Sequence, residues 1–427
     1  MGGKYRAYAE YKESGVEWLG NIPKHWSTTS LRWHINIASG EGLSNTVFDK
    51  SRDEVNRFRV IGGNGTLGYT AFINTDSKAF AIGRVGALCG NVHFVNEPCW
   101  ITDNALKLSA WSGFRDNYLY SLLSAAKLNE YASTTAQPLI TGDQVKSLKV
   151  VIPSNDEQEK IANFLNHETA KIDTLIEKQQ QLIKLLKEKR QAVISHAVTK
   201  GLNPDAPMRD SGVEWLGEVP GHWFVGRYKF CTSRIVVGIA EAATHAYAET
   251  GVPIIRSTNI REDGLDTSGM LFIKEEFAEK NDSKYLYAND VITVRTGYPG
   301  ISAVIPDYLD KSQCFTNLVA TPNKNIRSEF LSEYLNSHTG KSYFDLLGWG
   351  SAQKNISVPI LQNIPIAWPD ENEQDEIMEY VNKQRVRYTD LVGKAEDQIG
   401  LLKERRTTLI SSAVTGKINV QNWQAPT

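Results

Sequence analysis

Two long stretches of the chain place apolar residues on one face of a helix. From Ser154 to Thr199, and again from Asp370 to Thr415, apolar or aromatic side chains recur at steps of three, four or seven residues. This spacing predicts two long helices, each with one stripe that packs lengthwise against another helix. The stripe positions are Ile161, Leu165, Ile172, Leu175, Ile176, Ile183, Leu186 and Val193, then Ile377, Val381, Tyr388, Leu391, Val392, Ile399, Leu402 and Leu409.

Both stretches begin and end as helices do. Ser154 and Glu157 have the spacing of a capping box, as do Asp370 and Glu373, and glycines follow the far ends. Each helix would be about 65–70 Å long, and one helix of that length cannot bury its stripe alone. The simplest partner is the other copy, which predicts an antiparallel coiled-coil pair whose core is the stripe. The alternative is that each helix folds back on its own domain.

The segments before the two helices have the shorter period of strands. We expect strands near 57–61, 69–73, 78–82, 92–95 and 105–108, then a helix near 118–131. In the second segment we expect strands near 252–255, 271–273, 291–294 and 302–305, then a helix near 330–347. Glycines punctuate both segments. The fold class is therefore α+β, that is, mixed α/β, with two globular domains.

The chain is a duplication. The sequence SGVEWLG stands at 14–20 and again at 211–217, and each copy runs on to Pro-x-His-Trp, ending at Trp26 and Trp223. Pro153 to Gln158 corresponds to Pro369 to Gln374 at a different offset, so the intervening domains differ in length. The predicted layout is a repeat segment (1–26), domain 1 (27–152), helix 1 (153–203), a repeat segment (204–223), domain 2 (224–368), helix 2 (369–418) and a tail (419–427).

The two domains also share short, weakly similar motifs. Arg84-x-Gly86 with Gly90 resembles Arg295-x-Gly297 with Gly300. Residues 102–104 resemble 315–317, and Ala-Gln at 136–137 resembles Ala-Gln at 352–353. Most other residues differ. Two domains with one scaffold and unlike surfaces suggest two different ligands of the same class.

Composition narrows the class of protein. The chain has 427 residues, 41% of them hydrophobic, which is enough for two packed domains. There is no apolar run long enough to span a membrane, and the N-terminus lacks the apolar core of a signal peptide, so we expect a cytoplasmic protein. The formal net charge is −2. Domain 1 has 12 basic and 10 acidic residues, and domain 2 has 14 and 15, so neither is strongly basic.

Catalytic and metal motifs are incomplete. Residues 63–68 match GxGxxG, but a strand rather than a helix is expected to follow, which disfavours a dinucleotide site. Gly340-Lys341-Ser342 resembles the end of a phosphate-binding loop, but Leu335 stands where its first glycine should be. The four cysteines form no CxxC pair, and Cys89, His93 and Cys99 lack a fourth ligand. We therefore expect reduced thiols, no metal and no catalytic residues.

The whole pattern resembles the specificity subunit of type I restriction–modification enzymes. The repeated SGVEWLG and Pro-x-His-Trp, the variable domain, and the Glu-Gln that leads into a long helix all match this family. The resemblance implies a non-catalytic subunit with two target-recognition domains, each reading one half of a bipartite site in double-stranded DNA. It implies that the helix pair sets the spacer. Two modification subunits would bring S-adenosylmethionine for adenine methylation, and restriction subunits would bring ATP and Mg for restriction.

Candidate contact residues follow from residue type and loop position. For DNA we choose Asn64, Arg84 and Gln137 in domain 1, and Arg256, Asn259, Arg295, Tyr298, Gln353 and Lys354 in domain 2. Arg84 and Arg295 could instead be salt-bridged structural residues. Under the resemblance, Trp18, Trp26, Trp215 and Trp223 would dock the partner subunits, or alternatively pack only against their own helix. The rival functions are a methyltransferase with degenerate motifs and a structural coiled-coil scaffold without a DNA role.

Overall fold

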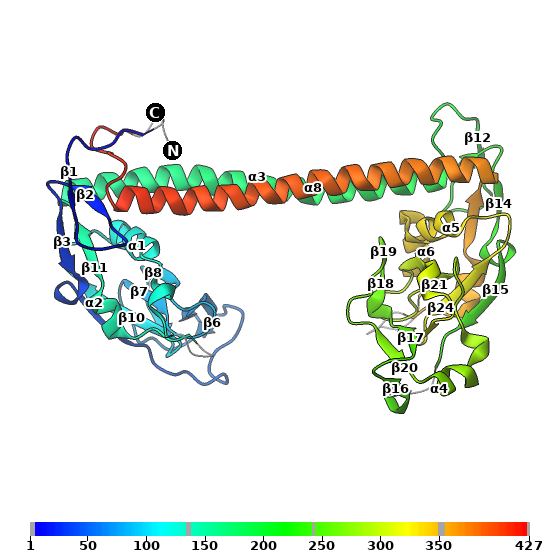
Figure 1. The fold of residues 1–427 in the computed structure, drawn as a ribbon, viewed down its shortest axis with the longest axis horizontal. Helices are drawn as coiled ribbons and strands as arrows, with labels where there is room; N and C mark the ends of the chain where they lie inside the picture. Colours follow the sequence, from blue (N-terminus) through cyan, green and yellow to red (C-terminus); the bar gives the residue numbers. More distant parts are fainter. Residues whose placement is uncertain (1–4, 134–137, 241–243, 349–354, 425–427) are drawn as a thin grey trace. The chain divides into compact units, whose positions relative to one another are not determined.

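The two long helices lie where the periodicity predicts them. In the computed structural model, α3 spans Asn155–Lys200 and α8 spans Glu371–Val414 (Figure 1). The structure describes residues 5–133, 138–240, 244–348 and 355–424. Contacts divide the chain into unit 1, residues 1–179 and 397–427, and unit 2, residues 180–396. Each unit therefore contains one end of both long helices.

Domain 1 lies in unit 1 and is built on two β-sheets. Strands β4 (Ile35–Ser39), β10 (Ala105–Trp111), β7 (Ala79–Gly83) and β8 (Val92–Val95) form an antiparallel sheet in that order. A second sheet has the order β6 (Gly65–Thr70), β5 (Phe58–Gly62), β9 (Cys99–Ile101), and its β5–β9 pair is parallel. Helices α1 (Asp116–Ala125) and α2 (Gly142–Ser147) complete the domain. Two-stranded pairs join β1 (Tyr11–Glu13) to β2 (Asn21–Pro23), and β3 (Ser27–Ser30) to β11 (Lys149–Ile152).

Strand β7 is buried on both faces because cores lie on both sides of its sheet. Phe80 and Ile82 belong to the larger core, which also includes residues of α1, α3 and α8. The alternate residues Ala79 and Ala81 belong to a smaller core shared with β9. Successive side chains of a strand point to opposite faces of its sheet. Because both faces of β7 are buried, nearly every residue of this strand is apolar.

Unit 2 repeats this arrangement. Strands β15 (Thr232–Val237), β24 (Leu318–Pro322), β21 (Val291–Thr293) and β22 (Ser302–Val304) form one sheet. Strands β16 (Tyr247–Ala248), β20 (Leu271–Ile273), β17 (Val252–Ile255) and β23 (Gln313–Cys314) form another, with β17 parallel to β23. Shorter pairs are β12 (Met208–Asp210) with β13 (Glu218–Pro220), β14 (Phe224–Arg227) with β25 (Pro365–Trp368), and β18 (Ile260–Arg261) with β19 (Gly264–Leu265). The helices are α4 (Glu275–Lys280), α5 (Ser328–Asn336), α6 (His338–Leu347) and α7 (Val358–Asn363).

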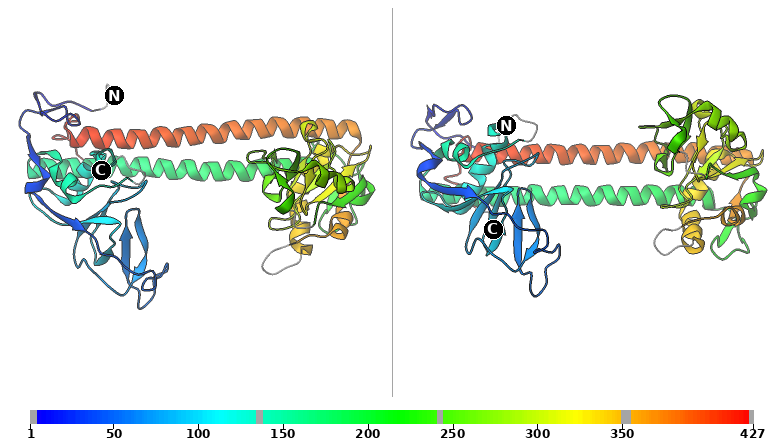
Figure 2. Two further views of the ribbon diagram at one scale, coloured as in Figure 1. Left: turned by 60° about the horizontal axis from the view of Figure 1, so that its bottom comes forward. Right: turned by 90° about the horizontal axis from the view of Figure 1, so that it is seen from below.

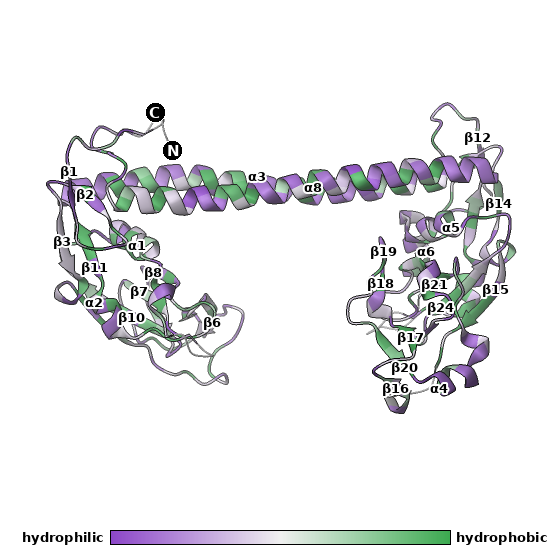
Figure 3. Cartoon of the chain, viewed as in Figure 1, coloured by the Kyte–Doolittle hydropathy of each residue, from purple (hydrophilic) through white to green (hydrophobic). Residues whose placement is uncertain are grey.

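The shared strand order shows that both domains have one mixed α/β scaffold. Figure 2 shows the sheets from two further directions, and Figure 3 shows that β21 and β24 are mainly hydrophobic whereas α3 and α8 mix both kinds of residue. One predicted helix, 330–347, is instead two, α5 and α6. Ser337 ends the first, and its hydroxyl caps the second by accepting a hydrogen bond from the amide of Gly340. Serine is a preferred N-cap residue, so it begins a new helix here.

Within unit 1, the ends of α3 and α8 run antiparallel. The Lys160 amine donates to the carbonyl of Gln421, and Arg406 forms an ion pair with Asp173 at 2.9 Å. As residue numbers rise along α3 from Lys160 to Asp173, the numbers of their partners fall from Gln421 to Arg406, so the two segments run in opposite directions. Within unit 2, one carboxylate, Asp263, lies within ion-pair distance of both Arg190 of α3 and Arg385 of α8.

The predicted stripe is buried at the helix ends and only half-buried further along. Ile161, Leu165, Ile172, Ile377 and Val381 are buried, whereas Leu186, Tyr388 and Leu402 are half-buried. Two positions are wrong as core residues. Leu175 is 46% exposed and its repeat counterpart Leu391 is 36% exposed. Both lie at the edge of the stripe, and a single neighbouring helix covers only its centre.

The repeated motifs meet at the start of each long helix. Ser154 caps α3 as predicted, because its hydroxyl accepts from the amide of Glu157. The Glu157 side chain does not return to the cap; its buried carboxylate accepts from the indole of Trp26 at 2.9 Å and the hydroxyl of Tyr8 at 2.7 Å. It also lies 3.1 Å from the ring Nε2 of His25. The helix N-terminus favours a negative charge at this position. We call this cluster the unit 1 joint.

Unit 2 has the same joint. The carboxylate of Glu373 accepts from the indole of Trp223 at 3.1 Å and lies 2.7 Å from Nε2 of His222. Asp370 caps α8 by accepting from the amide of Glu373. Trp26 and Trp223 are each only 1% exposed. Their burial contradicts the prediction that these two indoles dock partner subunits, and it supports the alternative that they pack against their own helix.

The glutamine that follows each glutamate ties the helix to its domain. Gln158 accepts from the amide of Arg115, and its own amide donates to the carbonyl of Gly113. Gln374 accepts from the amide of Arg327 and donates to the carbonyl of Asn325. The Glu-Gln dipeptide therefore holds the repeat segment with one side chain and the recognition domain with the next.

We expect Glu157→Ala to lower the free energy of unfolding of unit 1 by roughly 2–4 kcal/mol, because it leaves buried donors on Tyr8 and Trp26 without an acceptor. Urea denaturation followed by circular dichroism measures the change. Glu159→Ala is the matched control, since this side chain is 61% exposed and lies 3.9 Å from Arg115, and we expect it to cost less than about 0.5 kcal/mol. Equal losses in both variants would contradict a structural role for the buried carboxylate.

Candidate nucleic-acid interface

An arginine begins an equivalent glycine-rich loop in each domain. Arginine loop 1, residues 84–90, joins β7 to β8 and is closed by hydrogen bonds from Gly90 to the carbonyl of Gly83 and from Gly83 to that of Asn91. Arginine loop 2, residues 295–300, joins β21 to β22. It is closed by bonds from Gly300 to the carbonyl of Val294 and from Val294 to that of Ile301. The similar Arg-x-Gly motifs therefore mark one loop that was retained in both copies of the domain.

The surroundings of the two loops also match. The carbonyl of Arg84 accepts from the amide of Ile140, and the carbonyl of Arg295 accepts from the amide of Ile356. Both loops end at a glycine with positive φ, +87° at Gly90 and +97° at Gly300. A Cβ at Gly90 would lie 2.5 Å from the backbone nitrogen of Asn129, and one at Gly300 would lie 2.4 Å from the ring of Phe344. Only glycine fits at these two positions.

Both arginines keep an unneutralised charge. Arg84 is half-buried, and its guanidinium donates to the hydroxyl of Ser39 at 2.9 Å. Arg295 is also half-buried and donates from Nε to the side-chain carbonyl of Asn355 at 3.2 Å. Over the described ranges neither forms an ion pair, so the alternative that they are salt-bridged is wrong there. A guanidinium held by neutral acceptors retains donors for a phosphate or a guanine.

Asn64 lies next to arginine loop 1. It is exposed at the turn between β5 and β6, where the residues of the GxGxxG match form a hairpin rather than a dinucleotide loop. A Cβ at Gly63 would lie 3.3 Å from the Cα of Gly83, so the two turns pack backbone against backbone. Asn64 also lines a cavity of about 320 Å³ with Arg59, His93 and Tyr120.

The remaining candidates in domain 2 differ in exposure. Tyr298, in arginine loop 2, is 82% exposed, which leaves its ring free to contact a ligand. Arg256 is half-buried and donates to the carbonyl of Gly269. Asn259 is only 3% exposed; it accepts from the amide of Arg256 and donates to the carbonyl of Asp266. Asn259 therefore holds its own loop, and its selection as a DNA contact is wrong.

Three candidates, Gln137, Gln353 and Lys354, lie outside the described residues. Of the two other tryptophans, Trp18 is half-buried and donates to the carbonyl of Lys149, whereas Trp215 is 40% exposed and packs edge-on against Tyr343.

Sequence reasoning missed Ser39 and Asn355, the residues that hold the arginines. Asn355 could have been found, because its neighbour Ile356 stands at the repeat offset from Ile140.

The cysteines are buried neutral thiols. Burial raises the pKa of Cys99 to about 11 and the pKa values of Cys231 and Cys314 to about 12. It also raises the pKa of Cys89. These thiols stay protonated at neutral pH, a state that suits neither nucleophilic attack nor metal binding. Within the described ranges, no three His, Cys, Asp or Glu side chains are grouped so that they could hold a metal ion. No described helix is both long and apolar enough to cross a membrane.

Comparisons with known proteins match both halves of the chain. A family model described as the type I restriction modification DNA specificity domain matches residues 39–185 and 241–398. The EcoprrI specificity subunit of Escherichia coli is 33% identical over 141 residues, which cover 33% of this chain and 34% of that protein. The EcoBI specificity subunit of Escherichia coli is 20% identical over 434 residues, covering 97% of this chain and 91% of that protein.

A solved structure has the same fold. It comes from work on complex assembly and conformational transition of the type I R-M system. The match covers 93% of this chain and 99% of the chain in that structure, with a TM-score of 0.59 and 15% sequence identity.

Substitutions of two glycines in arginine loop 1 should differ in cost. Gly86 has a φ of +78° but open space around its Cβ position, so Gly86→Ala adds only backbone strain, about 1–2 kcal/mol. We expect Gly90→Ala to destabilise unit 1 by more, because it adds a clash with the backbone of Asn129. Urea denaturation and hydrogen exchange over residues 84–90 measure both effects. If Gly90→Ala were no more disruptive than Gly86→Ala, close packing would not define the loop.

Proposed function

The chain belongs to the type I restriction modification DNA specificity family, and from that premise we propose that its two domains read the two halves of a split DNA site. Domain 1, residues 27–152, would read one half, and domain 2, residues 224–368, the other. The chain itself would catalyse no reaction. We further propose that α3 and α8 form a continuous antiparallel coiled coil that sets the spacer between the half-sites.

The observation that carries the proposal is the arginine loop, which occurs twice on one scaffold with different neighbours. Arg84 and Arg295 begin equivalent loops, and among the described residues each guanidinium is held by a neutral acceptor and by no carboxylate. The exposed tips differ, since loop 1 presents Leu88 and loop 2 presents Tyr298. Equal frameworks with unequal contact residues fit two readers of the same polymer with different sequence preferences.

The near-neutral charge of the domains fits a division of labour. A reader that contributes a few base contacts needs no large basic surface if its partners supply most phosphate contacts. We propose that two modification subunits bind this chain, bring S-adenosylmethionine and methylate adenine within the split site. Restriction subunits would bring ATP and Mg. Such a complex would act in the cytoplasm, on cellular and incoming DNA.

Methylation mapping tests the proposal. The chain is co-expressed with its cognate modification subunit, and methylated adenines are located in genomic DNA; residues 27–152 are then replaced by the corresponding domain of another specificity subunit. We expect a split methylated site of which only one half changes. Methylation that does not depend on this chain would overturn the proposed function and leave the structural-scaffold reading. Methylation by this chain without a modification subunit would favour the degenerate methyltransferase.

We expect Arg84→Ala and Arg295→Ala each to relax recognition in a different half of the site. Loss of one arginine–guanine contact costs about 1–3 kcal/mol, or roughly 5- to 150-fold in discrimination at one base pair. Methylation of a library with randomised half-sites measures this. Lys127→Ala is the control, because its amine already pairs with Glu130. Relaxation of the same half by both variants would contradict the assignment of one loop to each half-site.

A further inference from the structure

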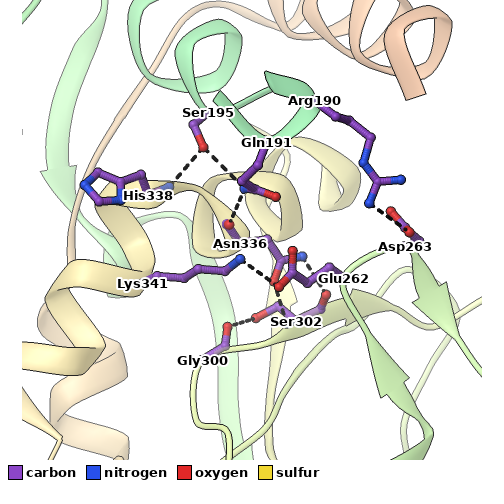
Figure 4. Close-up of polar contacts among 10 residues, drawn as sticks. All are labelled: Arg190, Gln191, Ser195, Glu262, Asp263, Gly300, Ser302, Asn336, His338 and Lys341. Atoms are coloured by element: carbon purple, nitrogen blue, oxygen red, sulfur yellow. Dashed lines mark hydrogen bonds and ion pairs between the residues drawn. The ribbon is translucent and has the colours of Figure 1, made fainter. Parts of the chain in front are cut away.

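In unit 2, the recognition domain is fastened to both long helices by charged side chains, and Figure 4 shows the contact with α3, between Arg190 and Asp263. Asp263, at the turn of the β18–β19 hairpin, lies 3.4 Å from Nη2 of Arg190 on α3. The other oxygen of Asp263 lies 3.4 Å from Nε of Arg385 on α8. One exposed turn of domain 2 thus contacts both helices at once, away from the joint at Glu373.

The cluster extends into the domain. Arg385 also forms an ion pair with Glu333 of α5, a side chain only 10% exposed. Arg190, Asp263, Arg385 and Glu333 alternate in sign, so the cluster has no net charge and leaves no buried carboxylate unpaired. Beside it, Lys341 of α6 pairs with Glu262 of the same hairpin at 2.7 Å.

A chain of hydrogen bonds continues from α3 to arginine loop 2. Gln191 donates to the backbone carbonyl of Asn336 at 2.9 Å. The Asn336 side chain accepts from the amide of Ser302 and donates to its carbonyl, at 2.9 and 2.8 Å. The Ser302 hydroxyl donates to the carbonyl of Gly300, which closes the loop that contains Arg295. A shift of domain 2 on α3 would therefore move Arg295 with it.

The residues that correspond to this cluster in unit 1 form a different contact. Arg190 corresponds to Arg406, which in unit 1 pairs with Asp173 of the neighbouring helix at 2.9 Å. The counterpart of Asp173 in α8 is Thr389, which has no charge to offer. The counterpart of Arg385 is Thr169. The same repeated arginine thus joins helix to helix in unit 1 and helix to recognition domain in unit 2.

We propose that Arg190, Asp263, Arg385 and Glu333 form a latch that fixes where domain 2 sits on the helix ends, and thereby restricts the spacer length that the protein accepts. Asp263 is the positioning residue, because its two carboxylate oxygens face Arg190 of α3 and Arg385 of α8. The proposal rests on the proposed function. The latch contacts no base itself, so its loss alters the spacing of the half-sites and leaves their sequences unchanged.

The test uses the full chain with its modification subunit and a DNA library in which the two half-sites are separated by spacers of every length around the preferred one. Sequencing of methylated molecules gives the spacer profile. We expect Asp263→Ala and Arg190→Met to raise the share of sites with a spacer one base pair longer or shorter by about two- to fivefold, the range for losing a partly exposed ion pair. The preferred half-site sequences should not change.

Two controls separate the latch from general destabilisation. Asp263→Glu keeps the charge and should keep the narrow profile. Lys394→Met removes an exposed ion pair within α8, the one with Asp390 at 2.7 Å, and should leave the profile unchanged. A wild-type profile in Asp263→Ala would overturn the latch, as would an altered half-site sequence, because the latter means that Asp263 contacts DNA.

Failure of the proposed function gives a different result. If the wild-type chain directs no methylation at any spacer, the latch is judged on the isolated chain by hydrogen exchange over residues 260–265. We expect faster exchange there in Asp263→Ala and unchanged exchange in Lys394→Met. Exchange that stays at the wild-type rate in Asp263→Ala would overturn the latch.

Discussion

A carboxylate at the first turn of each long helix, buried at Glu157 and half-buried at Glu373, is the interaction on which the rest of the structure depends. Glu157 accepts hydrogen bonds from the repeat segment through Trp26 and Tyr8. The next residue, Gln158, fixes the recognition domain. Burial and the hydrogen bond to Glu157 raise the pKa of Tyr8 above its ordinary value, so the phenol remains a donor. A helix start, a β segment and a globular domain thus share one short stretch of chain, which explains why these residues were retained in both copies.

The duplication preserved what orients each domain and changed what each domain presents. The joints, the strand order and the arginine loops recur, whereas the exposed loop tips do not. The divergence also reached the long helices, since the repeated arginine has an aspartate opposite it in one copy and a threonine in the other. A symmetric framework therefore carries two recognition domains that are attached in different ways.

Periodic features of this fold could be predicted from the sequence, and features that depend on pairing could not. The long helices were confirmed because their stripe repeats over many turns, and the arginine loops were found because the chain contains its own second copy. Periodicity cannot say how much of a stripe one neighbour covers, so Leu175 and Leu391 were misassigned. Residue type cannot say which way a side chain is turned, so Asn259 and the two buried tryptophans were misassigned. The Asp263 contacts join residues far apart in sequence, and no local pattern marks them.

The way each recognition domain enters and leaves the framework has an evolutionary consequence. Ser27, where domain 1 begins, pairs in register with Ile152, where it ends, and Phe224 pairs in the same way with Trp368. The first and last strands of each domain are therefore neighbours, and the joint lies just outside them. A genetic exchange with crossovers at these two places would import a complete folding module without disturbing either long helix. Recombination between duplicated genes could in this way produce a new combination of recognition domains in a single event, faster than the stepwise accumulation of point mutations.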